Sequence, residues 1–389
     1  MKILVVCQYY YPETVRITDI CEELVKRGHE VKVITDIPNY PMGEIYEGYG
    51  LLKNRNQTIN GVRVHRSFTI PRKSGPIFRV LNYYSFAFFS TIYAVFMKAD
   101  FDVVFVNQLS PVMMAYAAII YAKKHNKKLV MYCLDLWPES LVAGGITRGS
   151  LVYKLFHKFS KDIYKQFDKI LVTSKSFSNY FEKEFSLTNT EYLPQYAEEL
   201  FTPGFCRKEP DEYFDLMFAG NIGAMQSIDT IIKAAELLKN KKNIRWHIVG
   251  DGSELGNLKE QAKNLDNVFF YGRKSIEEMP KYYSMADAML VTMKKDPIIS
   301  LTLPGKIQSY MLAGKLILGA ADGEIKNTIN ESKCGLCCDA EDYVGLAKLV
   351  VELSQNGETE KYAKNSFDYY EENFLKSHFI DFLIEELTK

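Results

Sequence analysis

The sequence predicts an α/β fold in which two doubly wound, Rossmann-like domains face a cleft. Its 389 residues exceed what one hydrophobic core usually serves. Two series of short apolar runs alternate with helical patterns, which is typical of parallel sheets covered by helices. A stretch bracketed by Pro194 and Pro203 separates the two series. We therefore expect a first domain at residues 1–197, a second at 198–371, and a C-terminal helix at 372–389 that packs back on the first.

The composition is that of an ordinary soluble globular protein, with 47% hydrophobic and 25% charged residues. Basic and acidic residues balance at 48 each, which argues against a nucleic-acid partner. The cysteines are seven, an odd number that favours reduced intracellular thiols over a disulfide framework. Because the chain starts directly with an apolar strand instead of a signal peptide, we expect a cytoplasmic location.

The first domain is predicted to open with a strand at Lys2–Cys7 and a helix that ends at Lys26-Arg27-Gly28. Further strands are predicted at Glu30–Thr35, Val62–Arg66, Asp102–Asn107, Lys128–Cys133 and Lys169–Thr173. In such sheets ligands bind at the carboxyl ends of the strands. The loops at those ends are Gln8–Arg16, Gln108–Pro111, Leu134–Glu139 and Ser174–Lys175.

One segment of this domain, Val80–Met97, runs for eighteen residues without a charge. Its length would allow a membrane span. We reject a span because the segment contains several polar residues and would separate strands of one sheet across the bilayer. Two interpretations remain: a buried core helix, or a helix docked in the membrane interface with Arg72, Lys73 and Arg79 toward lipid phosphates. In the second, residues 72–98 make a peripheral contact with an anionic membrane.

The second domain repeats the alternation of strands and helices. Its strands are predicted at Asp215–Ala219, Ile244–Val249, Val268–Tyr271, Ala288–Thr292 and Leu316–Gly319. Its helices are predicted at Ser227–Lys239, Glu254–Leu265, Ile276–Met285, Tyr343–Leu353 and Glu358–Leu387.

Glycine-containing turns follow three of these strands. They carry the residues Gly220, Asn221, Gly223, Gly250, Gly272 and Arg273. Glycine lets backbone amides approach a diphosphate closely. A tight strand-to-helix turn also favours glycine without any ligand, but three such turns at neighbouring strand ends favour a nucleotide site.

A loop and a helix near Pro304 add a cation to this edge. Proline suits the first turn of a helix because its missing N–H would have no partner there. The unpaired amides of Leu303 and its neighbours carry partial positive charge, and Lys306 adds a full one. The pattern favours a bound diphosphate; the alternative is an ordinary capped helix with an exposed lysine.

Charged residues also follow strands of the first domain. Asp135 and Glu139 follow the strand that ends at Cys133, and Glu13 and Arg16 lie in the first loop. A carboxylate at a strand end can act as a base or orient a hydroxyl group. The alternative for each is a capping or salt-bridging role.

No metal site is predicted. Asp100 and Asp102 have the spacing of a metal-binding acidic pair, but they precede a strand on the far edge from the cleft. Cys334, Cys337 and Cys338 resemble half of a zinc site that lacks a second Cys/His pair nearby.

The motifs, taken in order, are Tyr10–Arg16, Asp135–Glu139, Gly220–Gly223, Val249–Gly252 and Leu303–Lys306 continuing to Gly314. Together they resemble the GT-B glycosyltransferases of the large retaining class called family four. The resemblance is to bacterial enzymes, similar to the fucosamine-type transferases of capsule, O-antigen and colanic acid pathways. It implies a hexosyltransferase-type enzyme that moves a sugar from a UDP-sugar with retention, without a metal or other cofactor.

The resemblance and the residues at the predicted cleft together lead us to assign roles and partners. Asp135, Glu13 and Lys306 would be catalytic, and Arg16, Trp137 and Glu139 would join Glu13 in binding a polyprenyl-diphosphate-linked or glycan acceptor. The donor would contact the glycine turns, Leu303, Lys306 and Ser309. The enzyme would lie in the cytoplasm, peripherally on the inner face of the cell membrane.

The chain departs from the family at two positions. The family commonly has two glutamates there, which hold the donor sugar and the ribose, and this chain has Leu301 and Ser309. Ser309 can still bond a ribose hydroxyl, and Leu301 suggests a donor lacking one hydroxyl, such as an N-acetylated deoxy sugar. Two rival functions remain: a nucleotide-sugar epimerase of the same fold, and a non-catalytic nucleotide-sugar-binding subunit.

Overall fold

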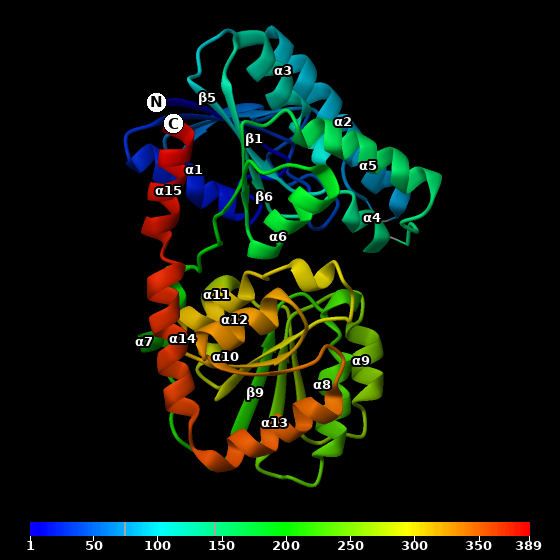
Figure 1. Cartoon of the computed structure of the whole chain (residues 1–389), viewed down its shortest axis with the longest axis vertical. Coiled ribbons are helices and arrows are strands. Elements are labelled where there is room, and N and C mark those ends of the chain that lie inside the picture. The colour runs from blue at the N-terminus through cyan, green and yellow to red at the C-terminus, as the bar shows by residue number, and fades with distance from the viewer. Residues whose placement is uncertain (74, 144) are drawn as a thin grey trace. The chain divides into compact units, whose positions relative to one another are not determined.

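The computed structural model describes residues 1–73, 75–143 and 145–389, which form two compact units (Figure 1). Unit 1 consists of Met1–Leu193 with Ile380–Lys389, and unit 2 of Pro194–Phe379. The first unit thus ends at Leu193 instead of the predicted residue 197. The chain returns to it at Ile380 instead of the predicted residue 372. Both units have an α/β architecture, as the sequence predicts.

Unit 1 is built on an eight-stranded sheet in the order β3-β4-β2-β1-β5-β6-β7-β8. All neighbours are parallel except β3 and β4. The strands are β1 (Lys2–Cys7), β2 (Glu30–Thr35), β3 (Asn56–Ile59), β4 (Val62–Arg66), β5 (Val103–Gln108), β6 (Lys128–Cys133), β7 (Lys169–Val172) and β8 (Thr190–Tyr192).

The hairpin of β3 and β4 is absent from our prediction. Its two turn residues, Asn60 and Gly61, both have positive φ, as a tight antiparallel turn between twisted strands requires. The dipeptide Asn-Gly between two short strands is a signal that would have found it.

The helical elements of unit 1 are α1 (Arg16–Lys26), α2 (Pro76–Phe96), η1 (Val112–Ala115), α3 (Tyr116–His125), α4 (Glu139–Ala143), α5 (Leu151–Tyr164), α6 (Lys175–Tyr180) and η2 (Phe181–Phe185). The end of α15 (Lys376–Thr388) joins them. Figure 1 draws α15 beside α1, where Arg27 and Asp381 form an ion pair at 2.7 Å.

Helix α2 is only partly buried. One face, with Asn82, Phe86, Ser90 and Ala94, packs into unit 1. The other face exposes large apolar side chains: Ile77, Phe78, Val80, Leu81, Tyr84, Phe88, Phe89, Ile92, Val95 and Phe96. The interpretation as a fully buried core helix is therefore wrong. Within the described residues, no helix has the length and apolar character that crossing a bilayer requires.

Unit 2 is built on a six-stranded parallel sheet in the order β11-β10-β9-β12-β13-β14. The strands are β9 (Phe214–Ala219), β10 (Ile244–Val249), β11 (Val268–Gly272), β12 (Ala288–Thr292), β13 (Leu316–Ala320) and β14 (Gly335–Cys338). The direction of winding reverses between β9 and β12. Ligands of doubly wound sheets bind at this reversal, outside the carboxyl ends of the strands.

The helical elements of unit 2 are η3 (Glu199–Phe201), α7 (Pro203–Cys206), η4 (Ala224–Gln226), α8 (Asp229–Leu237), α9 (Leu255–Gln261), η5 (Ile276–Glu278), α10 (Met279–Tyr283), η6 (Ile299–Leu301), α11 (Lys306–Leu312), α12 (Glu324–Ser332), α13 (Tyr343–Asn356) and α14 (Thr359–Asn373). Apolar side chains of these helices cover both faces of the sheet and form two hydrophobic clusters.

The prediction of one continuous helix over Glu358–Leu387 is wrong. The helix breaks after Asn373, where Phe374 leaves helical geometry and its ring is buried in the core of unit 2. A second helix, α15, then carries the chain to unit 1. No proline or glycine marks the break, so no local signal predicts it.

Candidate functional site

In unit 2 the loops after β9 and β10 touch backbone to backbone. The amide of Gly220 donates a hydrogen bond to the carbonyl of Val249 (3.0 Å), and the amide of Gly250 donates to Gly272 (2.9 Å). A Cβ on Gly250 would lie 1.8 Å from the Gly220 oxygen, and φ of Gly250 is 145°. Packing between loops therefore explains Gly250, and its predicted contact with a ligand stays a prediction.

Helix α11 is fastened to the end of β9 by Tyr310. The Tyr310 hydroxyl accepts a hydrogen bond from the amide of Ala219 (3.1 Å) and donates one to its carbonyl (3.0 Å). Lys306 lies one turn earlier on the same face of the helix. The fastening therefore places Lys306 at the carboxyl end of β9, next to the point where the winding reverses.

The Lys306 ammonium is held among backbone and ring atoms. Its Nζ lies 3.8 Å from the centre of the Phe218 ring, and a Cβ on Gly220 would lie 2.9 Å from it. Glycine at 220 thus leaves room for the lysine. The alternative of an exposed lysine does not describe this helix.

Burial lowers the pKa of Lys306 to about 7. In the described part of the chain, no carboxylate lies within ion-pair distance of its Nζ. A partly buried ammonium that faces an aromatic ring and no described carboxylate gains most from an anionic ligand. The end of β9 is therefore a candidate anion site.

Two residues predicted to contact the donor point elsewhere. Leu303 is 2% exposed and packs in the core of unit 2, so only its backbone is available to a ligand. Ser309 is buried, and its hydroxyl donates to the carbonyl of Gly305 (3.4 Å). Both side chains are therefore engaged within unit 2, and their predicted contacts with the donor stay predictions.

The remaining predicted donor residues stay at the strand ends. The side-chain amide of Asn221 and the backbone amide of Gly223 both donate to Gln226 Oε1, at 3.5 and 3.2 Å. Arg273, after β11, is exposed and lies 3.8 Å from Asp251. Gln226 and Tyr310 were missed by the sequence prediction, because neither belongs to a glycine turn.

In unit 1, Asp135 lies at the carboxyl end of β6. Its carboxylate accepts a hydrogen bond from the Ser110 hydroxyl, which is 2.7 Å from the hydroxyl of Ser140. Burial raises the pKa of Asp135. A carboxylate with serine hydroxyls beside it can orient the hydroxyl of an incoming molecule.

Glu13 ties two loops together. Its carboxylate accepts hydrogen bonds from the amides of Tyr10 (3.3 Å), Asn39 (2.8 Å) and Tyr40 (2.7 Å). It is buried, which raises its pKa to about 6. These contacts assign Glu13 to positioning the loops after β1 and β2, so direct contact with an acceptor would be a second role.

Glu139 and Trp137 are structural in unit 1. The Glu139 carboxylate accepts two hydrogen bonds from Arg148 (2.6 and 3.0 Å) and one each from Tyr153 and Tyr180 (2.7 Å). These donors give Glu139 an anchoring role in unit 1, and its predicted contact with an acceptor stays a prediction. Trp137 is buried against Phe156, which leaves its side chain little surface for an acceptor.

Arg16 is the first residue of α1 and is half-buried. Its charge lowers the pKa of Tyr132, whose burial acts more strongly in the opposite direction. Arg16 therefore lies within electrostatic reach of the carboxyl end of β6, near the strand that Asp135 follows.

A cluster around Arg72 was not predicted. Its guanidinium lies 5.5 Å from the ring centres of both Tyr40 and Tyr83 and donates to the Tyr9 hydroxyl (3.2 Å). Burial raises the pKa of Tyr83, and the nearby Asp135 adds to the shift. Arg72 is thus engaged with tyrosines of unit 1, close to the carboxyl ends of the strands. We call this region the polar edge of unit 1. Arg72 is not a free cation for lipid.

Asn82 attaches α2 to the same edge. Its side-chain amide donates to the carbonyl of Ile70 (2.8 Å) and accepts from Gln8 Nε2 (2.8 Å). Both partners lie near the ends of strands. An asparagine within a segment rich in apolar residues is the sequence signal that could have predicted this attachment.

Across the described residues, no group of three or more His, Cys, Asp or Glu side chains could hold a metal ion. Asp100 pairs with the Lys2 ammonium (3.0 Å), and Asp102 accepts from the Lys2 amide (2.7 Å). The expectation that no cofactor is needed stays a prediction.

Comparison with known families divides the chain where the structure does. Residues 14–193 match the family described as Glycosyltransferase Family 4, and residues 206–367 match the one described as Glycosyl transferases group 1. The first match lies in unit 1 and the second in unit 2.

Two bacterial proteins are similar to this chain in sequence, and a solved structure is similar to it in fold. The putative colanic acid biosynthesis glycosyl transferase WcaI of Escherichia coli (strain K12) is 24% identical, over 98% of this chain and 99% of its own. The probable glycosyltransferase WbjE of Pseudomonas aeruginosa is 27% identical, over 59% and 60%. The structure of Anabaena Alr3699/HepE in complex with UDP and glucose is similar over both whole chains, with a TM-score of 0.72 and 14% identity.

Proposed function

Since the chain belongs to the glycosyltransferases that join a Family 4 domain to a group 1 domain, with the GT-B fold, we propose a specific reaction for it. It transfers a sugar from a UDP-sugar to a glycan carried on a polyprenyl diphosphate, in the synthesis of a bacterial surface polysaccharide. The observation that carries the donor half of this proposal is the buried Lys306 ammonium at the end of β9.

The donor diphosphate fits that position. An anion beside Lys306 would restore the interaction energy that its burial removes. In the turn Gly220–Gly223 the amides of Gly220, Ile222 and Gly223 are bonded within unit 2, so among the described residues of this turn the amide of Asn221 is the one left for a diphosphate. The Anabaena structure of the same fold is described as a complex with UDP and glucose, which supports a uridine nucleotide. Leu301, where relatives commonly carry a glutamate, supports a deoxy sugar with an N-acetyl group.

The reaction proceeds with retention and without a metal. The acceptor oxygen forms a bond to the anomeric carbon on the face from which the diphosphate oxygen departs, and the departing diphosphate takes the acceptor proton. Lys306 stabilises the charge that develops on the diphosphate. Asp135 orients the acceptor hydroxyl, and Glu13 fixes the loops around it.

The exposed apolar face of α2 supports a lipid-linked acceptor and a peripheral place on the inner face of the membrane. It carries both aromatic and aliphatic side chains, and Lys73 and Arg79 stand at its start. Such a face, with cations beside it, is typical of helices that lie in the membrane interface. The name of WcaI, a putative colanic acid biosynthesis glycosyl transferase, supports the pathway class.

The test is an assay of the purified chain with a panel of UDP-sugars and a short polyprenyl-diphosphate sugar. We expect one UDP-sugar to be transferred, in the presence of a chelator, to a product whose new bond keeps the donor's anomeric configuration by NMR. Interconversion of UDP-sugars without an acceptor would identify an epimerase. Binding of UDP-sugars with no chemistry would identify a non-catalytic subunit, which Leu301 and Ser309 would then explain.

A further inference from the structure

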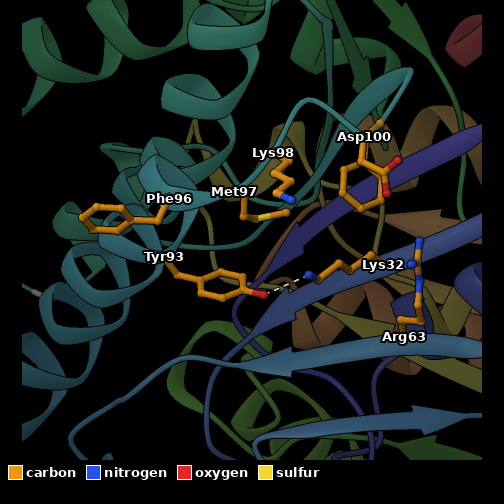
Figure 2. A pocket seen from close by; sticks show the side chains of 8 residues that line it. Lys32, Arg63, Tyr93, Phe96, Met97, Lys98 and Asp100 are labelled. Carbon is orange, nitrogen blue, oxygen red and sulfur yellow. Dashed lines mark hydrogen bonds between the residues drawn. The ribbon is translucent and has the colours of Figure 1, made fainter.

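A basic pocket lies at the C-terminal end of α2, and none of the predicted donor or acceptor residues lines it. Its volume is about 290 Å³. Three basic side chains line it, Lys32, Arg63 and Lys98, together with aromatic rings that include Tyr93 and Phe96 (Figure 2). Lys32 comes from β2 and Arg63 from β4, where the two residues are paired in register.

The charges in this pocket are only partly neutralised. Lys32 donates to the Tyr93 hydroxyl (2.8 Å), as Figure 2 shows, and within the described residues neither Lys32 nor Lys98 has a carboxylate at ion-pair distance. Arg63 has one such partner, Glu30, at 3.6 Å. The acid in the wall, Asp100, is already paired with Lys2 (3.0 Å). Positive charge is therefore left for an anionic ligand.

The position of the pocket identifies the kind of anion. Phe96 is 81% exposed and belongs both to the pocket wall and to the apolar face of α2. A molecule bound here would meet cations and a large apolar surface together. An anionic phospholipid has both parts, whereas a small soluble anion would leave the apolar surface without a partner.

The two ends of α2 are alike in charge. Lys73 and Arg79 stand at its start, and the pocket stands at its end. A helix of 21 residues spans about 31 Å. Cations at both ends of an exposed apolar face would hold the helix along the membrane surface and prevent it from tilting.

We propose that this pocket binds the phosphate of an anionic phospholipid and so anchors the end of α2 at the membrane. The proposal rests on the membrane contact in the proposed function and adds a specific lipid site. Arg63 offers a planar pair of N–H groups that suits phosphate, and Lys98 adds a point charge. The pocket adjoins the start of β5, the opposite edge of the sheet from Asp135, so it is separate from sugar transfer.

Flotation of the full chain with vesicles tests the pocket. The vesicles are phosphatidylcholine alone or mixed with phosphatidylglycerol. We expect Arg63→Lys, which keeps the charge but loses the planar fork, to weaken partitioning on the mixed vesicles about five-fold. We expect Lys98→Gln to weaken it clearly more than Lys123→Gln, a matched loss of an exposed lysine on α3, which packs beside α2.

If the chain were held by diffuse charge attraction alone, vesicle partitioning would depend on the number of charges and not on their position. If Arg63→Lys behaved as wild type and Lys98→Gln only matched Lys123→Gln, the lipid site would be overturned. Each variant is first compared with wild type by thermal unfolding, and Lys98→Arg serves as a charge-conserving variant of an exposed residue that should retain binding.

Inorganic phosphate distinguishes the sources of the anion. Added at equal ionic strength, it should release wild type from mixed vesicles more than chloride does, and this difference should vanish in Arg63→Gln. Binding of inorganic phosphate without vesicle binding would assign the pocket to a free anion and overturn the lipid proposal. The assay needs no donor or acceptor, so loss of transfer with intact vesicle binding would count against the proposed function alone.

Discussion

At the residue scale, Lys306 is the side chain whose surroundings say most about function. Its Nζ lies over the Phe218 ring, at the end of the strand where the winding of unit 2 reverses. Tyr310 holds it there by bonding both backbone groups of Ala219. A positioned cation that lacks a carboxylate partner in the described residues is costly to keep unless a ligand uses it.

Replacing Lys306 by Met should weaken donor binding and raise stability together. Methionine keeps an apolar stem over Phe218 but offers nothing to a diphosphate. We expect UDP-sugar binding to weaken by about 1.5–3 kcal/mol, the range of a charge-assisted hydrogen bond, and the midpoint of thermal unfolding to rise. Calorimetric titration and thermal unfolding measure the two effects. Lys259→Met, at an exposed site on α9, is the control, and unchanged binding in Lys306→Met would remove Lys306 from the site.

The pH dependence of donor binding should follow the pKa of Lys306. Free Lys306 has a pKa of about 7, lowered by burial from 10.5, and a bound diphosphate would raise it again. Affinity for a UDP-sugar should therefore be highest below about pH 7 and fall as the pH rises above it. Titrations across this range measure the effect, and a flat profile would contradict it.

The free energy of unfolding without ligand should rise with pH, whereas donor affinity falls. Because the folded pKa lies below the ordinary one, the unfolded chain binds more protons between about pH 7 and 10.5. The contribution of Lys306 thus makes the free energy of unfolding rise with pH in that window. The Lys306→Met variant should lose this part of the slope.

Replacing Asp135 by Asn tests the acceptor side. The change keeps the shape and the contact with Ser110 but removes the negative charge that would orient a hydroxyl. We expect transfer to fall about ten- to hundred-fold while UDP-sugar binding and the unfolding midpoint stay as in wild type. Asp162→Asn, at an exposed site on α5, is the control. Unaltered acceptor kinetics would return Asp135 to a purely structural role.

At the element scale, α2 connects two kinds of surface. Asn82 bonds it to Ile70 and Gln8 at the polar edge of unit 1, while its opposite face exposes apolar side chains. The buried contact of Asn82 would transmit a movement of the helix at a membrane to the loops that Glu13 holds. The helix is therefore an element through which a lipid surface could influence the acceptor edge.

Reversing the charges at the start of α2 should release the chain from anionic vesicles. Lys73 and Arg79 are exposed, whereas Arg72 is engaged with Tyr9, Tyr40 and Tyr83 and is left unchanged. In Lys73→Glu/Arg79→Glu we expect partitioning to fall roughly ten-fold or more, with activity lost on a long-chain polyprenyl acceptor and kept on a short soluble one.

The control for this variant is Lys239→Glu/Lys259→Glu, which makes the same change of charge in unit 2. Wild-type partitioning should also weaken as salt is added. An equal loss of activity on both acceptors would mean that the substitutions disturb the fold or the site, and not the membrane contact.

At the scale of the whole molecule, the chain leaves unit 1 at Leu193 and returns to it at Ile380. The last ten residues bury Ile380, Leu383 and Leu387 in unit 1, and Asp381 pairs with Arg27. The fold of unit 1 therefore depends on residues that are made after all of unit 2.

Leu383→Ala should destabilise unit 1 selectively. Deleting a fully buried leucine side chain costs about 2–5 kcal/mol, so hydrogen exchange in the strands of unit 1 should accelerate while UDP-sugar binding by unit 2 persists. Leu353→Ala, at a buried site on α13, is the reciprocal control and should act on unit 2. Equal acceleration in both units for Leu383→Ala would show that the units unfold together.

The two α/β units, most strand positions and the approximate place of Lys306 could be predicted from the sequence. These depend on local patterns: apolar runs of strand length, glycine turns, and a proline near the start of a helix. The exposed face of α2 was also open to prediction, as one of two interpretations of an uncharged segment. Each of these signals lies within about twenty neighbouring residues.

Which polar side chains are available for chemistry could not be predicted, because it depends on tertiary packing. The Glu139 carboxylate accepts hydrogen bonds from Arg148, Tyr153 and Tyr180. The Leu303 side chain packs in the core of unit 2. Tyr310 and Ala219 lie 91 positions apart, yet their contact places Lys306. The basic pocket likewise joins β2, β4 and the end of α2. Such contacts depend on how distant segments pack, and no local pattern encodes the partner that a side chain will meet.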